Sequence, residues 1–170
     1  GILSLDGDWN DFSGPVSFGT ETEGFTKVWL AADLQGSWQG INFDNLRGHY
    51  LGGQLAGELD LLWIDSFRMH GTLHGAGLNP GILLNDLQGL ATLDVTGELF
   101  VPYDETPLSA SISADVVSGQ LRGTNVSGGL ALDWQQGDLY EIAIDLSSED
   151  SRLFMQGKPA ERLDIDASTN

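Results

Sequence analysis

Two histidines four residues apart are the clearest candidates for chemistry in this sequence of 170 residues. On a helix, His70 and His74 would lie on one face and could hold a metal ion together. The surrounding residues alternate between apolar and polar, however, which predicts a β-strand. On a strand the two rings share a face but stand about 13 Å apart at ~3.3 Å per residue, too far to ligate one ion. With His49 they are all the histidines of the chain, so we expect no metal site.

Carboxylates are far more numerous, because the chain has 25 Asp and Glu residues against 7 Lys and Arg residues. Paired acids could serve a glycosidase, and clustered acids could bind calcium. Most of these carboxylates occupy the polar positions of predicted strands, where solubility alone would place them. The calcium-binding nonapeptide needs a glycine at its fourth position, and Gly52-Gly53-Gln54-Leu55 lacks it. We therefore expect a solvated acidic surface.

Several classes of function are disfavoured by what the sequence lacks. It has no cysteine, which excludes a thiol nucleophile, a disulfide and a zinc-cysteine site. It has no Gly-x-Ser-x-Gly elbow, no Walker loop and no dinucleotide fingerprint. Its net charge of −18 would repel the phosphates of nucleic acid and of anionic lipid surfaces. We predict a protein that is not an enzyme, uses no cofactor and does not bind nucleic acid.

A short tag recurs along the chain and carries paired Asp, Asn or Ser side chains. It consists of an apolar residue, two small turn-forming residues, a second apolar residue and then a glycine. Because Asp, Asn and Ser bond readily to nearby backbone, we interpret the tag as a hairpin turn. Its spacing of 20 to 21 residues, with one interval of 39, indicates stacked hairpins with strands of about 8 to 9 residues. The copies are Trp9 to Phe12, Phe43 to Leu46, Ile64 to Phe67, Leu84 to Leu87 and the degenerate Thr124 to Val126.

Alternation of apolar and polar residues dominates the segments between the tags and predicts an all-β protein. The 23 glycines disfavour helices, because each costs about 1 kcal/mol relative to Ala in a helix. The apolar positions of the predicted strands would form one continuous face, which is our candidate binding surface. Its residues are Leu55, Leu59, Leu61, Trp63, Leu93, Val95, Leu99, Ile112, Leu130, Leu132, Trp134, Ile142, Ile144 and Leu146.

Glycines punctuate the same predicted face. In Gly53-Gln54-Leu55-Ala56-Gly57 and three similar strings, the glycines share the parity of the central apolar residue. Glycine inside a strand often marks a bend, a bulge or a close approach by another group. A sheet bent at the same height in many strands would become a trough. In the other interpretation, which stays open, the glycines only relieve backbone strain at strand ends.

The glycine strings, the Asp44-Asn45-Leu46 type of tag, and segments such as Gly53 to Leu61 and Asn85 to Leu99 resemble the periplasmic repeat region of the TamB family. This family is related to AsmA-like and bridge-like lipid transfer proteins, and the acidic, cysteine-free composition is similar as well. The resemblance covers essentially the whole chain. It implies a β-taco, which is a long, U-shaped antiparallel sheet with an apolar interior groove. It implies no catalytic residue and no cofactor.

The resemblance also implies a location and partners. The family belongs to the translocation and assembly module of Gram-negative bacteria, where it is anchored in the inner membrane, spans the periplasm and meets the outer-membrane barrel TamA. It assists the assembly of autotransporters and other outer-membrane proteins, and it moves phospholipid between the two membranes. Because the chain begins at Gly1, we expect residues 1–170 to be a single β-taco segment of a longer protein, with the membrane anchor outside it.

Three roles for the apolar face are open. It could hold phospholipid acyl chains, it could hold unfolded strands of outer-membrane proteins, or it could be the closed core of a structural stalk or adhesin-type repeat. At ~0.8 kcal/mol per buried methylene, a 16-carbon tail could gain on the order of 10 kcal/mol. We favour the lipid role. Exposed sheet edges also predict edge-to-edge self-association of the chain.

Overall fold

The computed structural model describes residues 1–20, 27–83, 88–137, 141–158 and 162–169. Their backbone forms one sheet of thirteen strands and a short 3-10 helix, η1. The strands are β1 (Ile2–Leu3), β2 (Asp6–Asp8), β3 (Asp11–Thr20), β4 (Val28–Ser37), β5 (Gly40–Tyr50), β6 (Gly53–Leu62), β7 (Ser66–Leu78), β8 (Gly89–Pro102), β9 (Ser109–Leu121), β10 (Thr124–Gln135), β11 (Glu141–Ser148), β12 (Ser151–Lys158) and β13 (Arg162–Thr169), with η1 (Pro80–Ile82) between β7 and β8.

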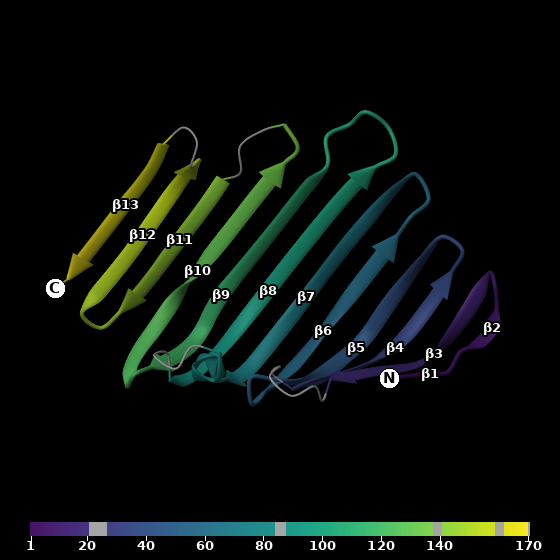
Figure 1. Ribbon diagram of the computed structural model, residues 1–170, viewed down its shortest axis with the longest axis horizontal. Coiled ribbons are helices and arrows are strands. Elements are labelled where there is room, and N and C mark those ends of the chain that lie inside the picture. Colours follow the sequence, from purple (N-terminus) through teal and green to yellow (C-terminus); the bar gives the residue numbers. More distant parts are fainter. Residues whose placement is uncertain (21–26, 84–87, 138–140, 159–161, 170) are drawn as a thin grey trace.

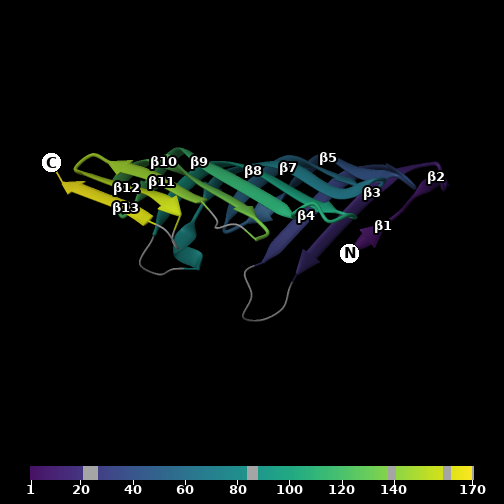
Figure 2. The ribbon, with the colours of Figure 1, turned by 90° about the horizontal axis from the view of Figure 1, so that it is seen from above.

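Strand order follows sequence order from β3 to β13, and every neighbouring pair is antiparallel (Figure 1). The short strands β1 and β2 both pair with the free side of β3. Seen from above, the strands form a single layer (Figure 2). No helix among the described residues is long and apolar enough to cross a membrane. This curved, open sheet of hairpins confirms the predicted fold class.

Some tags lie at hairpin turns, as predicted. Trp9 and Asn10 form the turn between β2 and β3, where the Asp8 carboxylate accepts a hydrogen bond from the Asn10 backbone N–H at 2.7 Å. The tag that begins at Ile64 lies at the turn between β6 and β7. Asp and Asn stabilise these turns through bonds to their own local backbone.

Two other tags do not form turns, so the prediction is wrong for them. Phe43 to Leu46 lies inside β5, where it forms a bulge opposite β6 and Asn45 adopts a φ of 52°. The same tolerance of positive φ suits Asn to a bulge and to a turn, so the motif does not distinguish them. Thr124 to Val126 begins β10, directly after the turn at residues 122–123. The copy at Leu84 to Leu87 lies outside the described residues.

The strands are also longer than predicted. The tag at Phe43 to Leu46 does not reverse the chain, so β5 continues through it. Strands β3 to β10 have 10 to 14 residues each. Four of the described turns between these strands contain no tag, namely residues 38–39, 51–52, 103–108 and 122–123. At Leu51-Gly52 and at Arg122-Gly123 both central residues have positive φ, which is the backbone of a type I′ hairpin turn.

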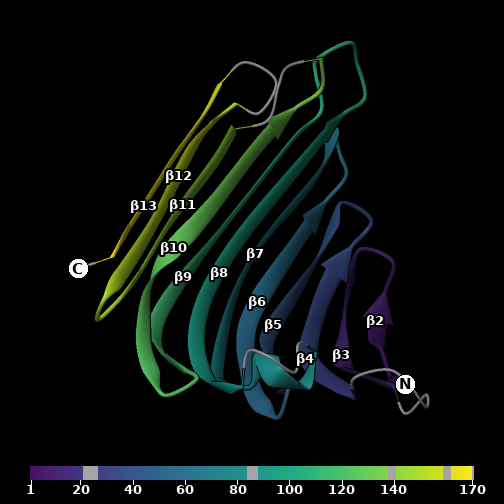
Figure 3. The same ribbon diagram turned by 60° about the vertical axis from the view of Figure 1, so that its left-hand side comes forward.

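The sheet bends at the end that carries η1. Bulges interrupt the pairing of β7 with β8, of β8 with β9 and of β10 with β9, all at the height of Leu93 and Val116. Bulges bend a strand and increase its local twist. Figure 3 shows the strands curving at this end.

The small core lies in this bend. Leu51, Leu55 and Leu78 are buried there and form one cluster. Partly buried apolar residues from several strands pack against it: Leu30, Tyr50, Leu73 and Leu93. The core is limited, and the accessible surface is 11140 Å². A compact monomer of 18.2 kDa is expected to expose about 8,100 Å². The excess surface is a direct consequence of the single open layer.

Candidate functional site

The strand register places the candidate residues on one face of the sheet, because residues directly opposite each other in antiparallel strands point to the same side. We define the apolar face as four rows that run across the strands. The first row is Ile41, Leu61, Met69, Leu99, Ala110 and Trp134, and the second is Leu34, Phe43, Leu59, Gly71, Gly97, Ile112, Leu132 and Ile142. The third row is Leu46, Gly57, Leu73, Val95, Ala114, Leu130, Ile144 and Met155, and the fourth is Phe18, Leu30, Gly48, Leu55, Gly75, Leu93, Val116, Gly128, Leu146 and Leu153.

All but one of the candidates from the sequence fall in these rows. The exception is Trp63, which lies just beyond the end of β6. Its indole Nε1–H donates a hydrogen bond to the backbone oxygen of Trp38 at 2.7 Å. The register therefore brings together candidate residues from β6, β8, β9, β10 and β11.

The apolar face is buried at one part and open at another. Leu55 lies in the core of the bend. Ile112 in β9 is 44% exposed, and Leu130 in β10 is 43% exposed. Large apolar side chains that stay this open over neighbouring strands are typical of a surface that meets a partner or a ligand.

Several glycines of the apolar face leave no room for a side chain. A Cβ added to Gly57 would lie 2.1 Å from the Thr72 oxygen, and one added to Gly48 would lie 2.1 Å from the Trp29 oxygen. Gly75 is covered by Leu78, whose Cδ1 would be 2.6 Å from such a Cβ. These positions lie inside strands, so close approach explains them better than strain at strand ends does.

The sequence reasoning missed part of the apolar face. In β7 it missed Met69 and Leu73, which alternate with glycines rather than with other large apolar residues. The Gly71-Thr72-Leu73 string was a usable signal, because Leu73 shares its parity with the glycines on either side. In β5 it missed Phe43, because the bulge breaks the alternation there.

The opposite face, which we call the polar face, carries the histidines. His74 Nδ1 lies 2.6 Å from Asp94 Oδ1, and His70 Nε2 lies 3.8 Å from Glu98 Oε1. Each ring thus meets a single carboxylate of β8. Among the described residues, no group of three or more His, Asp or Glu side chains could hold a metal ion.

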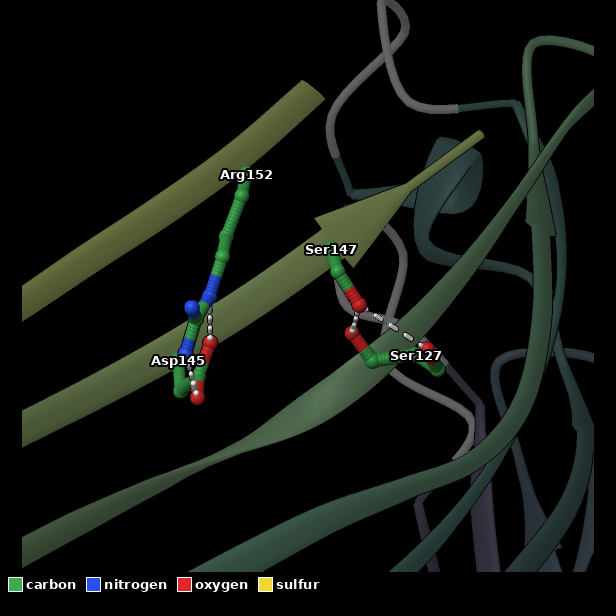
Figure 4. Close-up of polar contacts among 4 residues, drawn as sticks. All are labelled: Ser127, Asp145, Ser147 and Arg152. Atoms are coloured by element: carbon green, nitrogen blue, oxygen red, sulfur yellow. Dashed lines mark hydrogen bonds and ion pairs between the residues drawn. The ribbon is translucent and has the colours of Figure 1, made fainter. Parts of the chain in front are cut away.

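An ion pair joins two neighbouring strands on the polar face (Figure 4). Arg152 of β12 donates from Nε and Nη2 to the two carboxylate oxygens of Asp145 in β11, at 2.9 and 2.7 Å. These bonds hold the pKa of Asp145 below its ordinary value. Nearby, the hydroxyls of Ser127 and Ser147 lie 3.1 Å apart. The pair links strands whose apolar sides carry Leu146 and Leu153.

A hollow of about 790 Å³ lies over strands β7 to β11. Most of its lining side chains, including Arg68, Glu98, Ser111 and Asp133, occupy positions that alternate with the apolar rows. Four residues of the first row also line it, namely Met69, Leu99, Ala110 and Trp134. The hollow is therefore bordered by polar-face positions and by the first row of the apolar face.

Comparison with known proteins identifies the family of the chain. Neither a curated protein nor a solved structure matches it significantly. The family model described as "TamB, N-terminal domain" matches residues 1–170. TamB proteins are anchored in the inner membrane, span the periplasm and associate with TamA in the translocation and assembly module. The chain therefore belongs to the TamB family over its whole length and has a TamB-related role in that module.

Proposed function

We propose that the apolar face holds the acyl chains of phospholipids in the periplasm, as one segment of a longer β-taco conduit between the inner and outer membranes. The observation that carries this proposal is the alignment of the four rows, the shortest of which crosses β5 to β10 and the longest β3 to β12. Bulges shift the register at several points along the strands, but within each row every residue is paired with the next. The face is also open to a ligand at Ile112 and Leu130.

The physical properties of this face suit an acyl chain. Burial of apolar surface is worth about 25 cal/mol per Å² and has no directional requirement, so a bound tail can slide along the rows. The small side chains in the rows, such as Gly97 and Ala114, leave shallow space between larger ones. The acidic polar face keeps such a sheet in solution by charge repulsion.

A closed apolar core, as in a structural stalk, fits the fold less well. It requires a second layer over the apolar face, and the described residues contain none (Figure 2). A second sheet would also bury Ile112 and Leu130, which are both exposed.

Unfolded outer-membrane protein is the alternative cargo. Its strands alternate apolar and polar residues, so they could lay apolar side chains on the same rows and pair with a sheet edge. Among the described strands, β13 pairs only with β12, which leaves one such edge. The same edge supports our expectation that the isolated chain self-associates. TamA is the proposed partner in the full-length protein.

Matched charge substitutions test the lipid proposal. Ile112→Asp places a carboxylate on the apolar face, whereas Ser113→Asp places the same charge one residue away on the polar face. We expect Ile112→Asp to weaken the binding of a fluorescent 16-carbon fatty acid at least tenfold, because a charge must be desolvated under the tail. Ser113→Asp should bind as the wild type does. Equal binding by both variants would refute the proposal.

A photocrosslinking amino acid at Leu130 separates the two cargoes. In cells, lipid adducts at Leu130 and none at the neighbouring Ala131 would support the acyl-chain role. Adducts to outer-membrane polypeptides at Leu130 would favour the alternative cargo instead.

A further inference from the structure

The headgroup of a bound phospholipid cannot follow its tails onto the apolar face, because burying an unpaired charge is costly. If the proposed function holds, the headgroup must stay at the rim of the groove, where the strands end. The side chains of the turns along that rim therefore meet it first. Along one rim, the turns carry aromatic and acidic side chains and no Lys or Arg.

Three turns at the same edge of the sheet are joined by hydrogen bonds. They are residues 38–39, 63–65 and 103–108, along the upper edge in Figure 1. The Trp63 indole donates to the Trp38 oxygen at 2.7 Å, and the Trp63 backbone N–H donates to the Gln39 oxygen at 3.0 Å. The Tyr103 hydroxyl donates to the Trp63 oxygen at 3.2 Å. These bonds fix the side chains of Trp63 and Tyr103 and the backbone of Trp38, and so join three separate hairpins along one edge.

We call Trp38, Trp63 and Tyr103 the aromatic rim. In the sequence they continue the alternation of the apolar face, because each is an even number of residues beyond an apolar-face position of the same strand. Trp38 is 49% exposed and Tyr103 is 60% exposed. The rim thus borders the first row of the apolar face, with Trp63 half-buried and Trp38 and Tyr103 exposed to solvent.

The charges of these turns are all negative. Asp65, Asp104 and Glu105 are exposed, and the three turns contain no Lys or Arg. Hydrogen bonds from Thr106, first from its side chain and then from its backbone N–H at 2.9 Å, lower the pKa of the Asp104 carboxyl and keep it ionised at neutral pH.

The Lys and Arg residues on this side of the sheet do not neutralise the rim carboxylates, because Arg68 contacts other groups and Lys158 and Arg162 belong to distant strands. Arg68 occupies a polar-face position, donates to Ser66 Oγ at 3.1 Å, and holds its guanidinium 5.1 Å from the ring centroid of Phe100. Arg162 is the first residue of β13, and Lys158 is the last residue of β12, three strands beyond β9. At ~4.8 Å per strand that is about 14 Å, more than the ~8 Å Debye length at physiological ionic strength.

We propose that the aromatic rim selects phospholipids whose headgroup ends in a cationic amine, such as a zwitterionic ethanolamine or choline lipid, over anionic phospholipids. The rings offer cation–π contact to an ammonium group, and the carboxylates of Asp65, Asp104 and Glu105 attract it. The same carboxylates repel a headgroup whose only charge is its phosphate. The apolar face binds tails without regard to headgroup, so selection among lipids falls to the rim.

The test uses three lysophospholipids with the same 16-carbon chain and different headgroups: ethanolamine, choline and glycerol. Binding to the chain is measured below the micelle concentration of each lipid, by isothermal calorimetry. We expect the two amine lipids to bind about fivefold more tightly than the glycerol lipid at low salt, and about twofold more tightly at high salt, where the contact with the rings remains.

Two triple variants separate the rim from the charge of the whole molecule. Asp65→Asn, Asp104→Asn and Glu105→Gln together remove three rim carboxylates and should reduce the fivefold preference to about twofold, which the rings still supply. The control removes three polar-face carboxylates by Glu58→Gln, Asp115→Asn and Asp133→Asn, and should retain the full preference. Both variants lose the same net charge, so an equal loss of preference would overturn the rim and assign the effect to overall charge.

A further variant tests the rings. Tyr103→Leu keeps the apolar contact but removes the aromatic face and should reduce the preference about twofold. Equal binding of all three lipids to the wild type would refute this inference and leave the proposed function intact. Failure of every lysophospholipid to bind would instead refute the proposed function itself.

Discussion

A methyl group added at Gly57 should damage the bend of the sheet. Its Cβ would lie 2.1 Å from the Thr72 oxygen and 3.1 Å from the Leu73 Cα. Both neighbours are backbone atoms of β7, so relief requires the two strands to separate by about 1 Å rather than a side chain to rotate. Overpacking of this kind costs about 3 kcal/mol. For a protein of this size, that loss lowers Tm by about 6 to 12 °C.

Gly97→Ala is the matched control, because it adds the same methyl group to the same face. The nearest atom to its Cβ would be the Ser111 oxygen, 3.9 Å away. This variant should be neutral or more stable by up to ~1 kcal/mol, because Ala restricts the unfolded chain. Urea unfolding followed by tryptophan fluorescence measures both variants. If Gly57→Ala and Gly97→Ala had the same midpoint, the steric account of the glycines would be refuted.

Two further predictions concern the core and the polar face. Leu55→Ala should cost about 3 kcal/mol because it leaves a cavity in the bend, whereas Leu130→Ala should cost under ~1 kcal/mol because that side chain is 43% exposed; equal losses in urea unfolding would contradict this difference. The bonds from Arg152 stabilise the fold only while Asp145 is ionised, so their contribution is complete at neutral pH and is lost as the pH falls through the lowered pKa of Asp145. Asp145→Asn should therefore lower Tm at about pH 7 and leave it unchanged at about pH 2; a loss of the same size at both pH values would show that the ion pair is not the cause.

The period-2 alternation was enough to predict the sheet and the side on which most candidate residues lie. It succeeded in β10, where Leu130, Leu132 and Trp134 alternate with polar or small residues and no bulge intervenes between them. Alternate residues of a strand stay on the same face of the sheet only where no bulge interrupts the pairing. In β9 the bulge shifts the pairing between Val116 and Gly119, and no feature of the local sequence announces it.

The positions of the turns were harder to predict. Asn45 shows the reason, since its positive φ serves a bulge within β5 rather than a chain reversal. The Leu51-Gly52 turn shows the opposite case, in which a leucine takes a positive φ because the tight hairpin imposes it. Pairing with the neighbouring strands decides whether such a residue forms a bulge or a turn. Local sequence preferences carry no information about that pairing. The rim bonds between Trp38, Trp63 and Tyr103 were unpredictable for the same reason.

We propose that the apolar face carries lipid. Mass spectrometry of the lipids that remain bound to the protein through purification tests this proposal. We predict that the wild-type chain and Ser113→Asp retain stoichiometric phospholipid, whereas Ile112→Asp loses it while keeping the same circular dichroism spectrum. Retention of the same lipid by Ile112→Asp, or its absence from the wild type in every preparation, would contradict the account.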